Sequence, residues 1–430
     1  MHPFFERRFH LAEHGTTVKT EVLAGMISFF TIVYIIAVNA LILSEAGIPL
    51  QAGIVATVVT CFVGCLLVAF LGNAPLLIVP GMGVNALFSY TIVQGMGLPW
   101  QEALGAVFVA GILFTIVAFT PLSHTLSRSI PKGLKEAITV GIGLFLTLIG
   151  LEKGGIVVGG NNAILALGDF HSPEVLATVV TLLIALVLFI RNVPANFLLT
   201  IIAGSLIGHF FGVENAAPKQ ADVSLSNYLD VFAQFSFQGI FSVAFWIAVF
   251  SLAMVLVFEN IGLIHGQTEM IGKPEKYKRS IRATAISSML SGLFGTSPTV
   301  STVEAASGIT AGGRTGLTSL VSGLLFLVAL FFLPVISLIP NTAIAPILII
   351  IGGLMLENVK GINFKDFSEA FPAFLVIVII PFTYSIVDGM AFGFVAYPFM
   401  KLVLGRYKEV SVPLYIIAGL FLMNFFLHGI

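Results

Sequence analysis

The chain has 430 residues, of which 57% are hydrophobic and 10% are charged, and its formal net charge is −1. A soluble domain carries about 25% charged residues, so most of this chain cannot face water. The apolar runs continue over about 20 residues instead of alternating, which indicates a polytopic all-α membrane protein and argues against a β-barrel. The sequence has no basic domain face, so nucleic-acid binding has no support.

The apolar segments fall into two groups. We expect seven spans before a polar connector, at 22–45, 51–72, 76–94, 102–120, 131–151, 175–190 and 195–212. Seven more follow it, at 241–265, 280–295, 297–311, 315–337, 341–358, 369–386 and 389–404. The last apolar segment, 411–428, leaves two alternatives open. It is a fifteenth span, or 369–404 is one bent element around Pro381 and Asp388.

Because the first group has an odd number of spans, the second group enters the membrane from the opposite side. Two groups of equal size in opposite orientation are typical of the inverted repeats of secondary transporters. The third segment of each group supports this interpretation. PLLIVPGMGVNALFSY and TSPTVSTVEAASGITAGG are both short, and both join a β-like run to a Gly-rich helical start. Discontinuous spans at matching positions of two halves indicate a transport site.

Basic residues set the expected orientation, because cytoplasmic loops carry an excess of Lys and Arg. An N-terminus in the cytoplasm puts most of the basic loops on that side of a cell membrane. These basic residues are Arg7, Arg8, Lys19, Arg128, Lys132, Lys135, the cluster from Lys273 to Arg282, and Arg314.

Two carboxylates stand in strongly apolar surroundings. Glu259 lies near the end of the segment that begins at Phe241, and Glu304 lies in the broken tenth segment. An acidic residue at the centre of a membrane helix costs roughly 2.5–3.5 kcal/mol even on the gentler scales, so a chain that keeps two of them is expected to use them. The alternative is that one or both only bind neighbouring helices or backbone.

Beyond these two carboxylates, several longer stretches show that the chain resembles the nucleobase–cation symporter-2 superfamily, and within it the adenine/guanine/hypoxanthine permease branch. The matching stretches are AGMISFFTIVYIIAVNA at 24–40, PGMGVNALFSY at 80–90, IPKGLKEAITVGIGLFLTLIG at 130–150, VEAASGI at 303–309 and GRTGLTS at 313–319. The resemblance implies about fourteen spans in two inverted repeats of seven, and proton-coupled uptake of purine bases.

The resemblance also implies a core domain that moves against a gate domain. The core comprises 1–125 and 241–337, the gate comprises 126–214 and 338–430, and 215–240 connects them. One departure concerns the eighth segment, where members of the branch usually carry Asp-Thr after Phe. Here the sequence is Phe258-Glu259-Asn260, which leaves the exact purine preference open.

A purine offers N–H donors, and a carboxylate accepts such bonds with charge assistance. We therefore expect Glu259 and Glu304 to bind the base. Glycines in the first broken segment permit close backbone approach, an amide donates and accepts, and an aromatic ring stacks on the base. The full set of expected substrate-binding residues is Phe30, Thr31, Gly81, Met82, Asn85, Glu259, Asn260, Val303 and Glu304.

Proton coupling requires a group that changes charge, and burial favours the neutral form of a carboxyl group. Glu259 and Glu304 are the first candidates. His265 is a further one, although an interface histidine is the plainer interpretation. We expect no cofactor and no metal, with the proton as coupling ion, and a homodimer is among the expected partners.

Three other functions remain open. A xanthine, urate or uracil permease of the same superfamily differs only in substrate. An anion exchanger or channel would share the architecture, but two acidic residues at the site repel anions. An enzyme is the weakest alternative, because the sequence contains no metal-ligand cluster, nucleotide-binding loop or nucleophile elbow.

Overall fold

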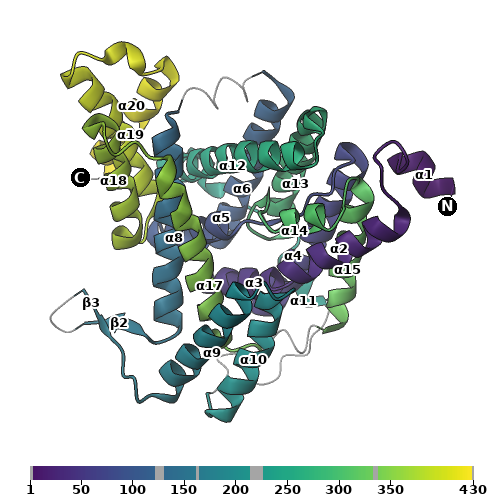
Figure 1. Cartoon of the computed structure of the whole chain (residues 1–430). Helices are drawn as coiled ribbons and strands as arrows, with labels where there is room; N and C mark the ends of the chain where they lie inside the picture. The colour runs from purple at the N-terminus through teal and green to yellow at the C-terminus, as the bar shows by residue number, and fades with distance from the viewer. Residues whose placement is uncertain (1–2, 122–129, 161–163, 214–225, 333–337, 429–430) are drawn as a thin grey trace. The chain divides into compact units, whose positions relative to one another are not determined.

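The structure is a computed structural model that describes residues 3–121, 130–160, 164–213, 226–332 and 338–428 (Figure 1). Arg128, residues 215–225 of the expected connector and the end of the expected 315–337 span lie outside this part of the chain. The chain divides into two compact units. Unit 1 comprises Met1–Thr120 and His171–Ile344, and unit 2 comprises Pro121–Phe170 and Ala345–Ile430.

The apolar segments are helical, as predicted. In the described residues, eight helical segments are long and apolar enough to cross a membrane, and four shorter apolar helices accompany them. Both short interrupted segments are also present. A strand of three residues begins each one, and a short helix follows it.

Unit 1 begins with α1 (Pro3–Phe9), α2 (Val18–Ile32), α3 (Ile35–Glu45), α4 (Leu50–Leu67) with its π-helical end η1 (Val68–Gly72), β1 (Ile78–Pro80), α5 (Met82–Ala86), η2 (Leu87–Gly95) and α6 (Trp100–Phe119). It continues with α9 (Pro173–Ile190), α10 (Asn196–Phe210), α11 (Ser226–Leu229), η3 (Gln238–Phe241), α12 (Val243–Met270), η4 (Pro274–Lys276), α13 (Tyr277–Phe294), β4 (Thr299–Ser301), α14 (Ala305–Thr310), α15 (Gly316–Ala329) and η5 (Leu330–Phe332).

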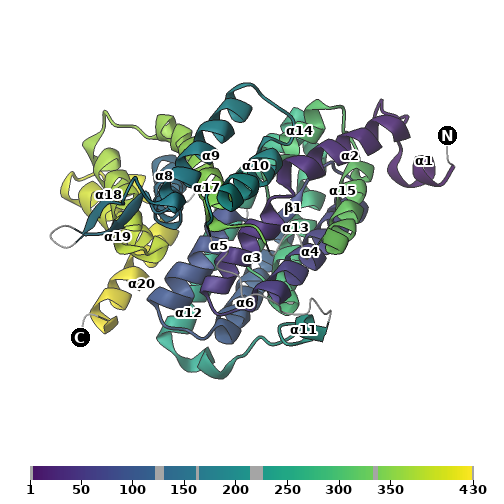
Figure 2. The same ribbon diagram turned by 90° about the horizontal axis from the view of Figure 1, so that it is seen from below.

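The two interrupted segments meet through their strands. β1 pairs antiparallel with β4, with Val79 opposite Val300, and the ribbon packs among α3, α4, α12 and α13 (Figure 2). A two-stranded ribbon leaves backbone groups unpaired, and buried backbone must find partners. Helix α13 supplies some of them, since the Ser288 hydroxyl donates to the Thr299 carbonyl at 2.5 Å and Ser291 accepts from the Thr299 N–H at 3.2 Å.

Unit 2 contains α8 (Lys132–Lys153), β2 (Val157–Gly159), β3 (Leu165–Leu167), η6 (Leu356–Gly361), α18 (Phe367–Thr383), α19 (Ile386–Val403), η7 (Tyr407–Glu409) and α20 (Val412–His428), and α17 (Asn341–Met355) crosses the boundary between the units. Tyr384 adopts a left-handed φ of 55° after α18, and the Ser385 hydroxyl accepts from the Asp388 N–H at the start of α19. Residues 369–404 are therefore two helices and not one bent element, and 411–428 forms the separate helix α20.

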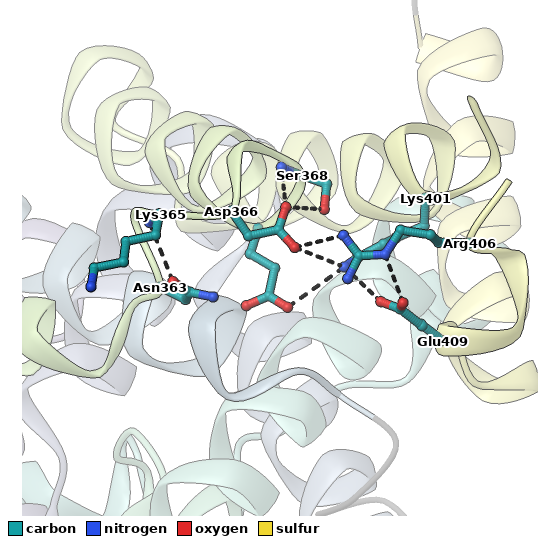
Figure 3. Close-up of polar contacts among 8 residues, drawn as sticks. Asn363, Lys365, Asp366, Ser368, Lys401, Arg406 and Glu409 are labelled. Atoms are coloured by element: carbon teal, nitrogen blue, oxygen red, sulfur yellow. Dashed lines mark hydrogen bonds and ion pairs between the residues drawn. The ribbon is translucent and has the colours of Figure 1, made fainter. Parts of the chain in front are cut away.

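An ionic cluster joins the ends of α18, α19 and η7 (Figure 3). Lys401 is fully buried, and its Nζ lies 2.9 Å from Glu409, 3.6 Å from Glu369 and 3.7 Å from Asp366. Arg406 donates to Asp366 at 2.7 Å and to Glu409 at 2.6 Å. A buried cation without partners would be costly, and here carboxylates surround it. We therefore interpret this cluster as structural.

Candidate functional site

The second interrupted segment carries Glu304, which directly precedes α14. The Tyr34 hydroxyl donates to Glu304 Oε1 at 2.7 Å. Tyr34 stands where the first apolar segment is interrupted, between α2 and α3. One turn earlier, the Thr31 and Ser307 hydroxyls are 2.9 Å apart. Two residues of the first segment thus hold the start of α14.

Glu259 lies on α12 and is partly exposed. No side chain or backbone group in the described residues makes a hydrogen bond with its carboxylate. The next residue, Asn260, is fully buried, and its Oδ1 accepts from the Ser301 N–H at 2.9 Å while its Nδ2 donates to the Leu256 carbonyl at 2.8 Å. The bond between Ser301 and Asn260 connects the part of α12 that carries Glu259 to β4, the strand that leads to Glu304.

Gln267 makes a second connection between α12 and this strand. Its Oε1 accepts from the Ser301 hydroxyl, and its Nε2 donates to the Thr302 carbonyl, both at 2.6 Å. Gln267 is not among the residues predicted from the sequence. The available signal was its spacing from Asn260, because residues seven apart on a helix share a face.

The first interrupted segment places Gly81 against the second. Its N–H donates to the Pro298 carbonyl at 3.3 Å. A Cβ at this position would lie 2.6 Å from Val300 Cγ2, so the close approach requires glycine. Met82 begins α5 and is partly exposed.

Asn85 is fully buried on α5, and within the described residues neither its Oδ1 nor its Nδ2 has a hydrogen-bond partner. Buried polar groups are nearly always hydrogen-bonded, so an unmet amide calls for a ligand or water. The protein leaves this donor and acceptor available, in the same unit as the two carboxylates.

The remaining predicted residues lie away from these contacts. Phe30 is 40% exposed, with its ring against Phe29, and Val303 is 64% exposed. His265 is exposed, and its ring meets Tyr277 edge-on at 5.9 Å. It lies two residues from Gln267, so the two side chains leave nearly opposite sides of α12. The structure thus joins Thr31, Asn260 and Glu304 to one polar network and does not join Phe30, Val303 or His265 to it.

A polar network built on two interrupted segments within an apolar helical unit defines a membrane transport protein. The chain belongs to the Permease family (Xan_ur_permease), whose family model matches residues 19–392. It is therefore a multi-pass membrane transporter and not an enzyme.

Curated relatives cover most of the chain. It is 51% identical to the Nucleobase transporter PlAzg2 of Paenibacillus larvae, over 88% of this chain and 76% of that protein. It is 38% identical to the Guanine/hypoxanthine permease PbuO of Bacillus subtilis, over 97% and 100%. It is also 35% identical to the Adenine permease AdeP of Escherichia coli, over 97% and 95%.

The fold is similar to that of the transmembrane domain of a cyanobacterial bicarbonate transporter, BicA. The TM-score is 0.63 at 15% sequence identity, and the match covers 86% of this chain and 97% of that one. At this identity the likeness concerns the fold alone, because one fold hosts different functions.

Proposed function

We propose that this protein imports purine nucleobases, with guanine and hypoxanthine as the preferred substrates and adenine as a further one. The observation that carries the proposal is the pair Glu259 and Glu304, linked through β4, of which Glu259 has no hydrogen-bond partner in the described residues. Curated relatives named for nucleobases, guanine/hypoxanthine and adenine support the choice of substrate class.

The chemistry fits a neutral base. Each charge-assisted bond from a ring N–H to a carboxylate is worth about 1.5–3 kcal/mol. In this scheme Glu259 and Glu304 accept hydrogen bonds from N–H groups of the base. The Asn85 amide, which can donate and accept, bonds to an acceptor and a donor on the edge of the base. Gly81 and Met82 supply backbone at the start of α5, Thr31 holds Ser307, and Phe30 and Val303 stay predicted substrate contacts.

Transport proceeds by alternating access and is coupled to a proton. Glu259 is the first candidate for the proton carrier, followed by Glu304 and then His265. In this scheme two inverted repeats of seven spans cross the cell membrane, α20 follows the second repeat, and the N-terminus is cytoplasmic. Residues 1–125 and 241–337 form the core, and 126–214 and 338–430 form the gate. A homodimer remains a prediction.

Two alternatives differ in substrate. A xanthine, urate or uracil permease would use the same carboxylates on another base. An anion transporter would share the fold seen in the bicarbonate transporter, but that likeness concerns the fold alone, and acidic residues at the site oppose anions.

Uptake of radiolabelled guanine, hypoxanthine, adenine, xanthine and uracil by cells that lack their own permeases tests the substrate class. We expect saturable uptake of guanine and hypoxanthine and exclusion of nucleosides. Saturable guanosine or uridine uptake without uptake of any purine base would contradict the proposal.

The coupling ion is tested in the same cells. Because a carboxyl group in apolar surroundings changes its access from one side of the membrane to the other more readily when protonated, uptake should rise as external pH falls and collapse with a protonophore. Uptake that does not depend on the proton gradient but depends on a sodium gradient would show that the proton is not the coupling ion.

A further inference from the structure

We propose that Gln267 is a positioning residue for the substrate site. Together with Asn260 it forms a clamp that fixes the β4–α14 junction, and with it Glu304, against α12. The inference rests on the proposed function, because it assigns Gln267 a role in placing a proposed substrate ligand.

The clamp consists of three hydrogen bonds from one helix to two consecutive residues. Asn260 Oδ1 accepts from the Ser301 N–H at 2.9 Å. Gln267 Oε1 accepts from the Ser301 hydroxyl and Gln267 Nε2 donates to the Thr302 carbonyl, both at 2.6 Å. Backbone and side chain of Ser301 are thus both bonded to α12.

Ser301 ends β4, and Glu304 follows three residues later. The segment between them is irregular, and irregular backbone at membrane depth needs buried partners. Gln267 supplies one of them, for the Thr302 carbonyl, from a side chain that is only 4% exposed, and it also accepts from the Ser301 hydroxyl. On the other side, Tyr34 and Thr31 hold Glu304 and Ser307. Glu304 is therefore set between two sets of bonds, one from α12 and one from the first segment.

Position matters for a carboxylate that binds a base, because a hydrogen bond weakens steeply once its angle is lost. A side chain that only stabilised the fold would change how much protein is made. A side chain that places Glu304 would also change the KM of the protein that is made.

The test compares Gln267→Leu, Ser301→Ala and the double variant, with Thr268→Val as matched control. Thr268 is the next residue, is fully buried, and donates only to the Ile264 and His265 carbonyls of its own helix. Losing two buried hydrogen bonds should raise the KM for guanine about tenfold in Gln267→Leu, with a smaller rise in Ser301→Ala. The double variant should be no worse than Gln267→Leu, because the paired residues share one interaction.

Hydrogen–deuterium exchange of the purified proteins gives a readout that needs no transport. Peptides from residues 297–311 should exchange faster in Gln267→Leu than in wild type and remain unchanged in Thr268→Val. An unchanged KM together with unchanged exchange in Gln267→Leu would overturn the clamp. If the wild type moves no nucleobase, the proposed function fails, and the exchange comparison still decides whether the clamp exists.

Discussion

Glu21 and Glu259 are both carboxylates on helices of unit 1, yet their surroundings are opposite. Glu21 is fully buried, and its oxygens accept from the N–H groups of Arg314, Thr315 and Thr318 and from the Thr318 hydroxyl, at 2.6–3.3 Å. It caps the start of α15 from a distant part of the chain. Glu259 is partly exposed and makes no hydrogen bond with the described residues.

The difference separates a structural acid from one that the proposed function assigns to the substrate. The acceptor sites of Glu21 are used by orphan N–H groups of a helix start, which is a common way to satisfy such groups. A ligand would find few of them free. Glu259 keeps its acceptor sites available. Apolar sequence context alone does not distinguish the two residues, whereas the count of satisfied acceptor positions does.

The largest effect is expected for Glu21→Gln. An amide places a donor among donors and removes the charge, so several buried N–H groups lose their acceptor, each at a cost of about 1–3 kcal/mol. We expect the amount of folded protein in the membrane and its melting temperature in detergent to fall sharply, with an unchanged KM in any protein that remains. Glu13→Gln, on an exposed side chain, is the control. Normal folding of Glu21→Gln would show that Glu21 does not stabilise the fold, and its difference from Glu259 would then not hold.

Glu304→Gln should affect transport more than folding. The tyrosine donor can still find an amide oxygen, but a charge-assisted bond to the base is lost, so the KM should rise at least about tenfold at unchanged surface expression. Glu102→Gln, in the first turn of α6, should change little, because a carboxylate at a helix end can reach water. A normal KM would leave Glu304 as a residue that only orders α14.

Tyr34→Phe sharpens the same comparison with a smaller expected effect. The ring keeps its edge-to-face contact with Phe197 at 5.1 Å, and only the donor to Glu304 disappears. The carboxylate then loses one orienting bond, and the KM should rise about threefold to tenfold. Tyr415→Phe, which loses an exposed bond to a backbone carbonyl, should transport normally. A KM unchanged by Tyr34→Phe would mean that this hydroxyl does not orient Glu304.

The smallest effect is expected at the ionic cluster of unit 2. Hydrogen bonds from Ser368 and Arg406 hold the pKa of Asp366 well below its ordinary range, and bonds from Arg406 and Lys401 lower the pKa of Glu409. A carboxylate whose pKa is depressed by folding contributes stability that is present above its unfolded pKa, about 4, and is lost as the pH falls below it.

Arg406→Gln should therefore lower the melting temperature slightly at about pH 7 and shrink the drop in melting temperature that occurs as the pH falls from about 4 to about 2. Lys408→Gln, on an exposed neighbour, is the matched control. An acid-induced drop as large in Arg406→Gln as in wild type would show that this ion pair does not shift the two carboxylates.

Much of the fold follows from local sequence. The apolar segments and the interruptions at Gly81 and before Glu304 are visible as composition and glycine placement. The strand pairing and the bond from Tyr34 to Glu304 join residues more than 200 positions apart. No local pattern specifies such pairs, because tertiary packing brings them together. The contacts of Glu21 with residues 314–318 are hidden from the sequence for the same reason.

The most direct test of the account is binding of radiolabelled guanine to the purified wild type and to Glu259→Gln, with Glu102→Gln beside them. The amide keeps the shape of the side chain but cannot accept a charge-assisted bond. We predict that Glu259→Gln weakens the Kd at least about tenfold at an unchanged melting temperature, while Glu102→Gln binds as wild type. Normal guanine affinity in Glu259→Gln would contradict the account and leave Glu259 as a packing group.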